Sequence, residues 1–246
     1  MLRSVKEFEG YPLLASDGKI GHVTDCLFDD RDWTMRYLVA DAGSLVPHHV
    51  IISPDHLDQP EVGWTGKRFR VNLTKQQVKD SPPLDSDAPL SRRYEIDLAK
   101  HYQQVDPYWK SSVFDPEVAE HEKRLEEIAE CHLRSANRVR RDQVHATDGE
   151  IGHIDDFIVD TSSWKMRYFV VKTRNFLPGG TVLIGIDWIQ SIDRTGSKVN
   201  VDLTCEKIRK SPEFDVHEPV NRDYEGRLYD YYGKPRYWQE PDGPVF

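Results

Sequence analysis

The chain has 246 residues, of which 38% are hydrophobic and 30% are charged, and its net charge is -9 at pH 7. This length allows either one large domain or two domains of ordinary size. The acidic balance speaks against a nucleic-acid partner, because phosphate backbones repel a protein of this sign, and no stretch approaches the ~18 uninterrupted apolar residues of a membrane span.

The first elements predicted along the chain form a hairpin. Asp17-Gly18 is a tight-turn signal, because glycine tolerates the positive φ that such a turn requires. A strand is expected from Ile20 to Phe28, where Gly21 permits a bulge or a close backbone approach. After an aspartate-rich turn, a second strand is expected from Trp33 to Ala40, with the tryptophan packed in the core. Two further strands are expected over 50–52 and 68–73.

A short helix, a strap and a linker are expected next. Thr74 is a predicted N-cap for a helix from Lys75 to Lys79, which Ser81-Pro82 ends. The Pro, Gly and Asp content beyond it predicts an extended aromatic strap rather than regular structure. Residues 111–134 have the pattern of a charged helical linker, with Asp115 as its cap and one narrow apolar stripe.

The second half of the chain repeats the first. Ala15 to His22 returns as Ala146 to His153, and Met35-Arg36-Tyr37 returns as Met166-Arg167-Tyr168 at the same offset. Thr204 then stands where Thr74 stood, before a second short helix from Cys205 to Arg209. Such self-similarity indicates an internal duplication. The predicted organisation is a first unit, a linker and a second unit with its own aromatic strap: 1–110, 111–134 and 135–246.

The repeated DGxIG segment, followed by an aromatic-x-Met-Arg-Tyr strand, resembles the PRC-barrel family. That family shares a small β-barrel with the H subunit of the photosynthetic reaction centre and with the ribosome maturation factor RimM. The resemblance covers Val5 to about Leu73 and Asn137 to about Leu203. It implies a mainly β chain of two tandem PRC-type barrels that dock onto a larger assembly, and it carries over no catalytic residues.

Two kinds of histidine site are candidates for chemistry. His22 with Asp25, and His153 with Asp156, are repeated pairs that could form acid–base couples. The alternative is a surface histidine beside an aspartate that anchors a turn, and no serine or cysteine nucleophile recurs beside either pair. A second cluster, His48 and His49 with His56, could bind a transition metal through imidazole nitrogens.

Arginine and aromatic side chains are candidates for binding. Arg36 and Arg167 could hold a carboxylate or phosphate, or could instead pair with nearby acids. The aromatic residues beyond the short helices are too interleaved with charge to be all core, and a partner-binding surface needs such a mixture. The candidates for that surface are Tyr102, Tyr108, Trp109, Tyr229, Tyr231, Tyr232, Tyr237 and Trp238.

The function expected from these patterns is a non-catalytic protein-interaction or assembly module, with an unknown protein partner and possible homo-oligomers. One alternative is a small-molecule or metal-binding protein, possibly a hydrolase, using the His/Asp groups between the barrels. Another is a peripheral component beside a photosynthetic or respiratory membrane complex. No cofactor is predicted. Three cysteines without a CxxC pair suit a reducing compartment, and no secretion signal is recognised, so a cytoplasmic location is expected.

Overall fold

The computed structural model describes residues 1–43, 46–58, 67–84, 92–103, 132–173, 180–193 and 197–239. Contacts divide the chain into two compact units. We call Glu7–Ser135 the N-terminal unit; the C-terminal unit consists of Ala136–Phe246 together with Met1–Lys6. The expected linker helix falls mostly outside the described residues. Among the residues that are described, no helix is long and apolar enough to cross a membrane.

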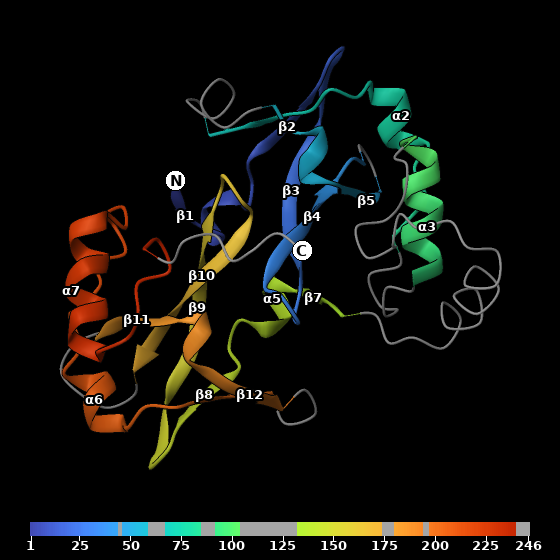
Figure 1. Ribbon diagram of the computed structural model, residues 1–246. Helices are drawn as coiled ribbons and strands as arrows, with labels where there is room; N and C mark the ends of the chain where they lie inside the picture. Colours follow the sequence, from blue (N-terminus) through green and yellow to red (C-terminus); the bar gives the residue numbers. More distant parts are fainter. Residues whose placement is uncertain are drawn as a thin grey trace. The chain divides into compact units, whose positions relative to one another are not determined.

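The N-terminal unit is built on an antiparallel ladder of β3 with β4 (Figure 1). Strand β2 lies on the other edge of β3 and pairs in parallel with β6, while β5 pairs with β4. Its strands are β2 (Pro12–Ala15), β3 (Gly18–Asp29), β4 (Thr34–Asp41), β5 (His49–Ile52), β6 (Phe69–Arg70) and β7 (Leu133–Ser135). Its helices are η1 (Lys6–Phe8, starting one residue before the unit), η2 (Pro54–His56), α2 (Lys75–Lys79) and α3 (Arg92–His101).

The C-terminal unit has the same kind of ladder, between β9 and β10. Strand β8 pairs with β9, β11 pairs with β10, and β13 joins β8 to β12. Its strands are β1 (Leu2–Ser4), β8 (Gln143–Ala146), β9 (Gly149–Asp160), β10 (Lys165–Thr173), β11 (Thr181–Gly185), β12 (Ile189–Asp193) and β13 (Lys198–Val201). Its helices are α5 (Ala136–Val139), η3 (Ile186–Trp188), α6 (Cys205–Arg209) and α7 (Arg222–Tyr232).

The prediction of a mainly β chain is confirmed, but the described strands form open sheets rather than closed barrels. Closing a barrel requires the first and last strands to ladder along their length. In the N-terminal unit, β6 has two residues and pairs with β2 at one edge, while β5 has four and pairs with β4 at the other. The described strands of the N-terminal unit therefore do not form a continuous closed ladder, although an isolated bridge joins Leu57 to Val71.

Glycines at matching places let two backbones approach closely, as the sequence predicted. A Cβ at Gly21 would lie 1.8 Å from the carbonyl oxygen of Asp41, and one at Gly152 would lie 2.0 Å from that of Lys172. Both ladders also shift register nearby, between Leu13 and Leu14 in β2 and at the corresponding place in β8. Only glycine fits there, because the space of a side chain is filled by the neighbouring strand.

The two tryptophans expected in the strand core are instead turn residues. Trp33 and Trp164 have φ of 56° and 57° and are half-buried. The left-handed conformation closes the turn before β4 or β10 and carries the side chain out of the strand alternation. Trp33 stacks on Phe28 with ring centroids 5.3 Å apart. The strands themselves begin one residue later, at Thr34 and Lys165.

The short helices are confirmed with their predicted bounds. The Thr74 hydroxyl accepts a hydrogen bond from the Gln77 amide, and the Gln77 side chain accepts one from the Thr74 amide, which completes a capping box. In the C-terminal unit, the Thr204 hydroxyl accepts from the Lys207 amide at the start of α6. These caps satisfy amides that have no partner inside the helix.

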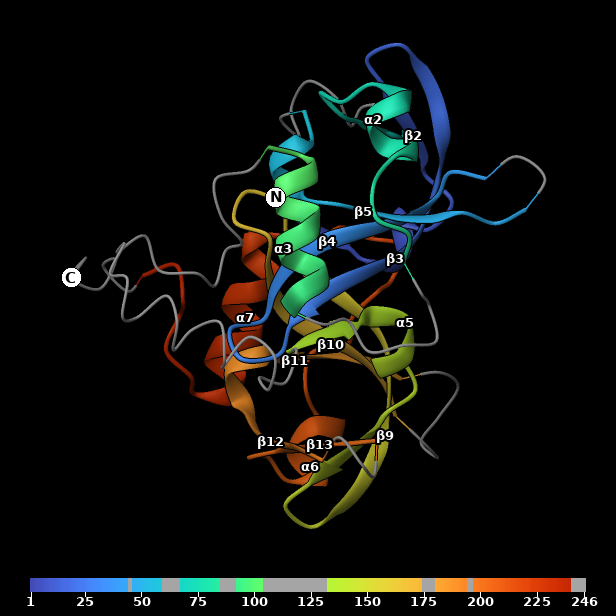
Figure 2. The same ribbon diagram turned by 90° about the vertical axis from the view of Figure 1, so that its right-hand side faces the viewer.

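The expectation of extended aromatic straps is wrong, because α3 and α7 are helices. Asn221 caps α7 by accepting from the Tyr224 amide, and Gly233 ends it at φ 65°. Between them, Tyr224, Leu228 and Tyr232 recur every four residues and are all buried. Helix α7 lies along the β10–β11 side of its unit (Figure 1), and α3 accompanies β4 in the other (Figure 2). The glycine and charged residues suggested irregular structure, but the buried side chains at four-residue spacing form one face of a helix.

The short strands β1 and β7 are exchanged between the units. Strand β1 precedes the N-terminal unit but pairs with β9, in the C-terminal unit. Strand β7 immediately precedes the C-terminal unit but pairs with β3, in the N-terminal unit. Leu133 and Arg134, placed in the helical linker by the sequence analysis, belong to this strand.

Candidate functional site: a buried glutamate beneath an arginine–aromatic surface

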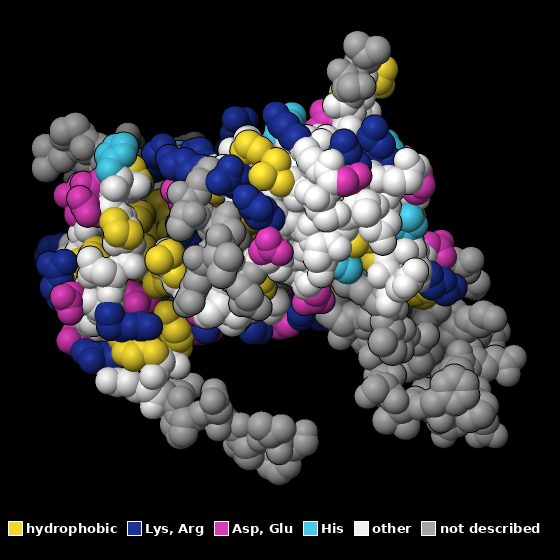
Figure 3. Space-filling view, turned by 90° about the horizontal axis from the view of Figure 1, so that it is seen from above, with side chains coloured by type: hydrophobic (Ala, Val, Ile, Leu, Met, Phe, Trp, Pro, Cys, Tyr) yellow, Lys and Arg dark blue, Asp and Glu magenta, His cyan; other side chains and the backbone are white. Residues whose placement is uncertain are grey.

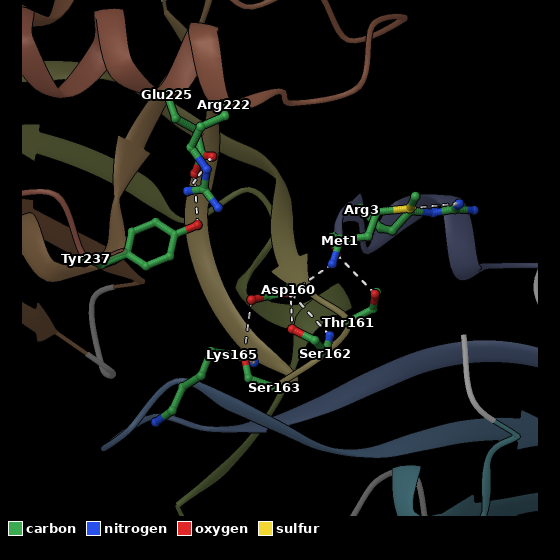
Figure 4. A network of polar contacts seen from close by, with 10 residues as sticks. All are labelled: Met1, Arg3, Asp160, Thr161, Ser162, Ser163, Lys165, Arg222, Glu225 and Tyr237. Atoms are coloured by element: carbon green, nitrogen blue, oxygen red, sulfur yellow. Dashed lines mark hydrogen bonds and ion pairs between the residues drawn. The ribbon is translucent and has the colours of Figure 1, made fainter. Parts of the chain in front are cut away.

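Glu225 is the buried carboxylate at the centre of the candidate site. It lies in the first turn of α7 and is 1% exposed. Its Oε1 accepts from the hydroxyl of Tyr168 at 2.6 Å and from that of Tyr237 at 2.9 Å. Its Oε2 lies 3.0 Å from Nη1 of Arg222. Figure 4 shows Tyr237 and Arg222 pointing toward this carboxylate. A buried charge needs such partners, and here β10, α7 and the following segment each supply one.

The tyrosine hydroxyls of this cluster remain donors over the physiological pH range. Burial raises the pKa of Tyr168 far above its usual value, and the neighbouring Tyr229 and Glu225 raise it further. Burial and the charge of Glu225 raise the pKa of Tyr237 to about 12. Each phenolate would place a second negative charge beside the first, so protonation is favoured. The cluster therefore holds one carboxylate and two neutral donors.

Two guanidinium groups flank the Tyr237 ring. Arg167 lies over it at 4.0 Å from the ring centroid, and Arg222 lies at 5.7 Å. Arg222 also covers the ring of Trp238 at 4.3 Å. Within the described part of the chain, Arg167 has no carboxylate partner, and its Nε has no hydrogen-bond partner. Cation–π contact and stacking stabilise this arrangement while leaving the guanidinium of Arg167 able to receive an acid.

The aromatic rings continue from the buried core to the surface. Tyr229 is buried under Trp188, at 5.3 Å between ring centroids, and contacts Trp238 at 5.0 Å. Tyr237 and Trp238 are half-buried, and their rings meet edge to face at 5.0 Å. Figure 3 shows hydrophobic side chains interspersed with charged ones on the side of the molecule where α6 and α7 lie. We call Arg167, Arg222, Arg236, Tyr237 and Trp238 the arginine–aromatic surface.

The aromatic residues proposed from the sequence thus divide into two groups. Tyr102, Tyr229 and Tyr232 are buried, so their assignment to a partner surface is wrong. Their rings fill the space between a helix and its sheet, as the contact of Tyr232 with Trp188 at 4.6 Å illustrates. The half-buried members are Tyr231, Tyr237 and Trp238. Tyr108 and Trp109 lie outside the described residues.

The N-terminal unit contains a related carboxylate site. Glu95, on α3, is 2% exposed and accepts from the hydroxyl of Tyr37 at 3.2 Å. The preceding tyrosine of each helix donates to a proline carbonyl, Tyr94 to Pro82 and Tyr224 to Pro212. Met-Arg-Tyr and Tyr-Glu each occur in both halves of the sequence. The sequence analysis did not connect them, because the signal for their contact is the helical spacing that it missed.

The aspartates of the predicted His/Asp couples are bound by serines. Asp25 accepts from the hydroxyl of Ser135, and Asp156 accepts from that of Ser4. Each carboxylate also accepts from the amide of the next residue in its strand. Asp156 is 6% exposed, and burial raises its pKa to about 6. Both aspartates therefore hold the exchanged strands, a role the sequence did not suggest.

The repeated histidines, His22 and His153, are not buried with these aspartates. His22 is exposed, and it pairs across the ladder with Asp41; His153 is half-buried and pairs with Lys172. Neither position places an imidazole in a buried pocket with a carboxylate.

The second histidine cluster is arranged around Asp41 and Asn72. Asp41 accepts from the backbone amides of His48 and Gly43, which together with the histidines lower the pKa of its carboxyl group. Nδ1 of His56 lies 3.1 Å from the side-chain oxygen of Asn72. Over the residues that the structure describes, no group of three or more His, Cys, Asp or Glu side chains could hold a metal ion. Arg36, the other predicted anion-binding residue, forms an ion pair with Asp32.

Comparison with protein families identifies one segment. Residues 133–207, which run from β7 into α6, match the model of the PRC-barrel domain. This part of the chain is similar to PRC-barrel domains. The resemblance seen in the sequence is thereby confirmed for the PRC-barrel segment in the second half. The match does not extend to Val5–Leu73, and no curated protein matches the chain.

Proposed function

We propose that the chain is a non-catalytic protein-interaction module that binds its partner through the arginine–aromatic surface. The presence of a PRC-barrel domain supports an interaction or assembly role at a coarse level. We further propose that the first half is a second copy of this unit, derived by duplication, which would give the module two related bodies.

One observation carries the choice of surface: a buried carboxylate holds half-buried Tyr237, and Trp238 packs edge to face against the Tyr237 ring. Tryptophan, tyrosine and arginine supply most of the binding energy at interfaces when they stand in rigid, well-packed surroundings. Because Glu225 already fixes Tyr237, little side-chain entropy remains to be lost on binding.

The chemistry of this surface favours an acidic segment of the partner protein. Arg167 has no carboxylate partner within the described residues, and it is stacked on Tyr237 with its orientation fixed. A partner carboxylate would complete it with charge-assisted hydrogen bonds. The alternative uses of the chain, in metal or small-molecule binding and beside a membrane complex, have no comparable supporting observation.

The test is affinity capture of the tagged full-length protein from its own cells, comparing wild type with Trp238→Ala. Removing all of α7 by ending the chain at Pro219 would be less informative, because it deletes the buried side chains of Tyr224, Leu228 and Tyr229. Trp164→Ala is the matched control, since Trp164 is also half-buried in the same unit but lies in the β9–β10 turn.

A partner retained by wild type and by Trp164→Ala, and lost by Trp238→Ala, is the expected result. Unfolding curves of both variants establish that the loss reflects the surface rather than the fold. Equal recovery of the same partner by Trp238→Ala and wild type would contradict the assignment of this surface.

A further inference from the structure

The strand exchange follows the same register in both units. Leu2, Arg3 and Ser4 lie opposite Asp160, Val159 and Ile158. Leu133, Arg134 and Ser135 lie opposite Asp29, Phe28 and Leu27. The two three-residue strands have the same sequence, Leu-Arg-Ser, and each serine donates to the aspartate of its own site, Asp156 or Asp25. Each unit thus contains one strand-binding site, and it is filled by a segment that is joined directly to the other unit.

The site on β9 binds its strand through backbone and side chain together. Asp156 accepts from the Ser4 hydroxyl and, at 2.9 Å, from the Lys6 amide. The Val5 amide donates to the carbonyl of Phe157, and the Thr161 amide donates to the carbonyl of Met1. The Met1 amino group lies 3.1 Å from Asp160 (Figure 4). These contacts recognise an extended segment with a hydroxyl at its third strand position.

The two sites differ in charge at the residue that follows the paired part of the edge. Asp30 lies beside the β3 site and pairs with Arg134 at 2.8 Å and with His132 at 3.2 Å. Thr161 stands at the equivalent place beside β9 and has no carboxylate, so it cannot form those ion pairs. Asp30 is 9% exposed, and a buried charge pair is expensive to break. The ion pairs that Asp30 forms with the β7 segment therefore have no counterpart at Thr161.

We propose that the edge of β9 along Ile158–Asp160 is a self-association site whose occupant is the Leu2–Ser4 strand of a second copy of this chain. Strand β1 is joined to the N-terminal unit but lies on the C-terminal unit. Its contacts with β9 are therefore the same whether β1 and β9 belong to one chain or to two. Exchange of an identical element between copies needs no new interface. This inference concerns a different face from the arginine–aromatic surface and does not depend on the proposed function.

Competition within the chain sets the concentration dependence of this exchange. The chain passes directly from one unit to the other at Lys6–Glu7 and at Ser135–Ala136, so the strand of the same chain competes at a high effective concentration, on the order of 1 mM for a short tether. Exchange between chains is thus expected to increase as the chain concentration approaches this range.

Disulfide trapping between full-length chains tests the proposal. One chain carries Arg3→Cys and the other Val159→Cys, because these residues lie directly opposite in the ladder. Cys131 is replaced by serine in both chains. A cross-chain disulfide is expected, with a yield that rises with concentration. Lys19→Cys, at an exposed position, replaces Arg3→Cys to measure random collision. Adding Ser4→Pro to the Arg3→Cys chain is expected to reduce the yield to that background.

Two results would overturn the proposal. In the first, the double variant Arg3→Cys/Val159→Cys forms its disulfide within one chain, while the mixture never exceeds the Lys19→Cys background up to about 1 mM. In the second, the double variant forms no disulfide, which would mean that β1 does not occupy the β9 edge. Circular dichroism of each variant shows that the trapping compares folded chains.

Discussion

Buried carboxylates place the largest energetic demands on single residues of this protein. Glu225 and Glu95 are nearly inaccessible to water, and each accepts a hydrogen bond from a strand tyrosine. Glu225 has two tyrosine hydroxyls and a guanidinium, and its contact with Tyr168 is 2.6 Å. Glu95 accepts from Tyr37 at the longer distance of 3.2 Å. The two strand tyrosines are therefore a matched pair in which to compare the same hydroxyl deletion.

Tyr168→Phe is expected to destabilise the protein more than Tyr37→Phe. A hydrogen bond to a charged group contributes about 1.5–3 kcal/mol, and deleting the donor leaves the buried carboxylate short of a partner. We expect a loss in this range for Tyr168→Phe and about 1 kcal/mol less for Tyr37→Phe. Urea unfolding of both variants measures the difference. Equal losses would mean that the shorter contact adds nothing to stability.

Asp156 makes stability depend on pH in a direction opposite to that of a surface carboxylate. Burial raises its pKa from 3.8 to about 6 in the folded chain. Between these values the folded form binds more protons than the unfolded form, so the free energy of unfolding decreases as pH rises. The stabilisation that protonated Asp156 contributes is complete below pH 4 and is lost as the pH rises past 6.

Asp156→Asn is expected to remove this contribution, which is at most about 3 kcal/mol for a shift of this size. The test is the difference in unfolding free energy between wild type and variant at pH 4 and at pH 7. The variant is expected to lose stability relative to wild type at pH 4 and to regain it at pH 7. A difference that does not vary with pH would contradict the assigned titration.

At the scale of elements, glycine has opposite effects in strands and in α7. Ala at Gly21 or Gly152 would place a Cβ within 1.8–2.0 Å of a backbone oxygen, so the ladder must separate. We expect a loss of about 1–3 kcal/mol or more, as for other overpacked sites. At Gly226, within α7, the nearest atom is the end of Arg236 at 4.0 Å. Gly226→Ala is therefore expected to stabilise the chain by about 0.5–1 kcal/mol. Thermal unfolding of all three variants shows whether each substitution stabilises or destabilises the chain.

The sequence predicted those elements whose signals are local. Thr74 and Thr204 identified the short helices, and Gly21 identified a close approach, because caps and glycines act within a few residues. The predictions were wrong where the sequence pattern fits two kinds of structure. Trp33 looks like the start of a strand, but its positive φ is set by the turn. In α7 the buried tyrosines are interleaved with charge, which obscured a helical period of four.

For the candidate site, the sequence located several of the right residues without their contacts. Tyr237, Trp238 and Arg167 were all singled out; Tyr237 donates to the buried carboxylate, and Arg167 lies over the Tyr237 ring. Glu225 was not among the residues singled out. Its role depends on α7 packing against β10, and no local pattern encodes that tertiary contact.

At the scale of the whole molecule, the choice of strand partner could not be predicted. Leu-Arg-Ser occurs twice, and a three-residue segment does not specify which of two similar edges it joins. Domain boundaries drawn from the sequence follow chain order, whereas the contact units do not.

The exchange predicts that the protein survives a cut in its linker. With a protease recognition sequence inserted after Asp115, the N-terminal fragment keeps β1, which lies in the C-terminal unit, and the other fragment keeps β7. We expect the cleaved protein to elute as one species of unchanged mass in size-exclusion chromatography with light scattering. Ser4→Pro together with Ser135→Pro is the control in which separation is expected. Prompt separation of the cleaved wild type would contradict the exchange.

The exchange of β1 and β7 also determines when each unit can complete its sheet during translation. When the N-terminal unit has emerged up to α3, the edge of β3 still lacks β7, which is synthesised last of all its strands. Strand β1 emerges first, but β9 is about 150 residues away and not yet made. Nascent chains therefore expose two unpaired edges during most of translation, and an open edge is a route to aggregation. Both units become complete only after the second half of the chain has been translated, so they are expected to mature together rather than in sequence.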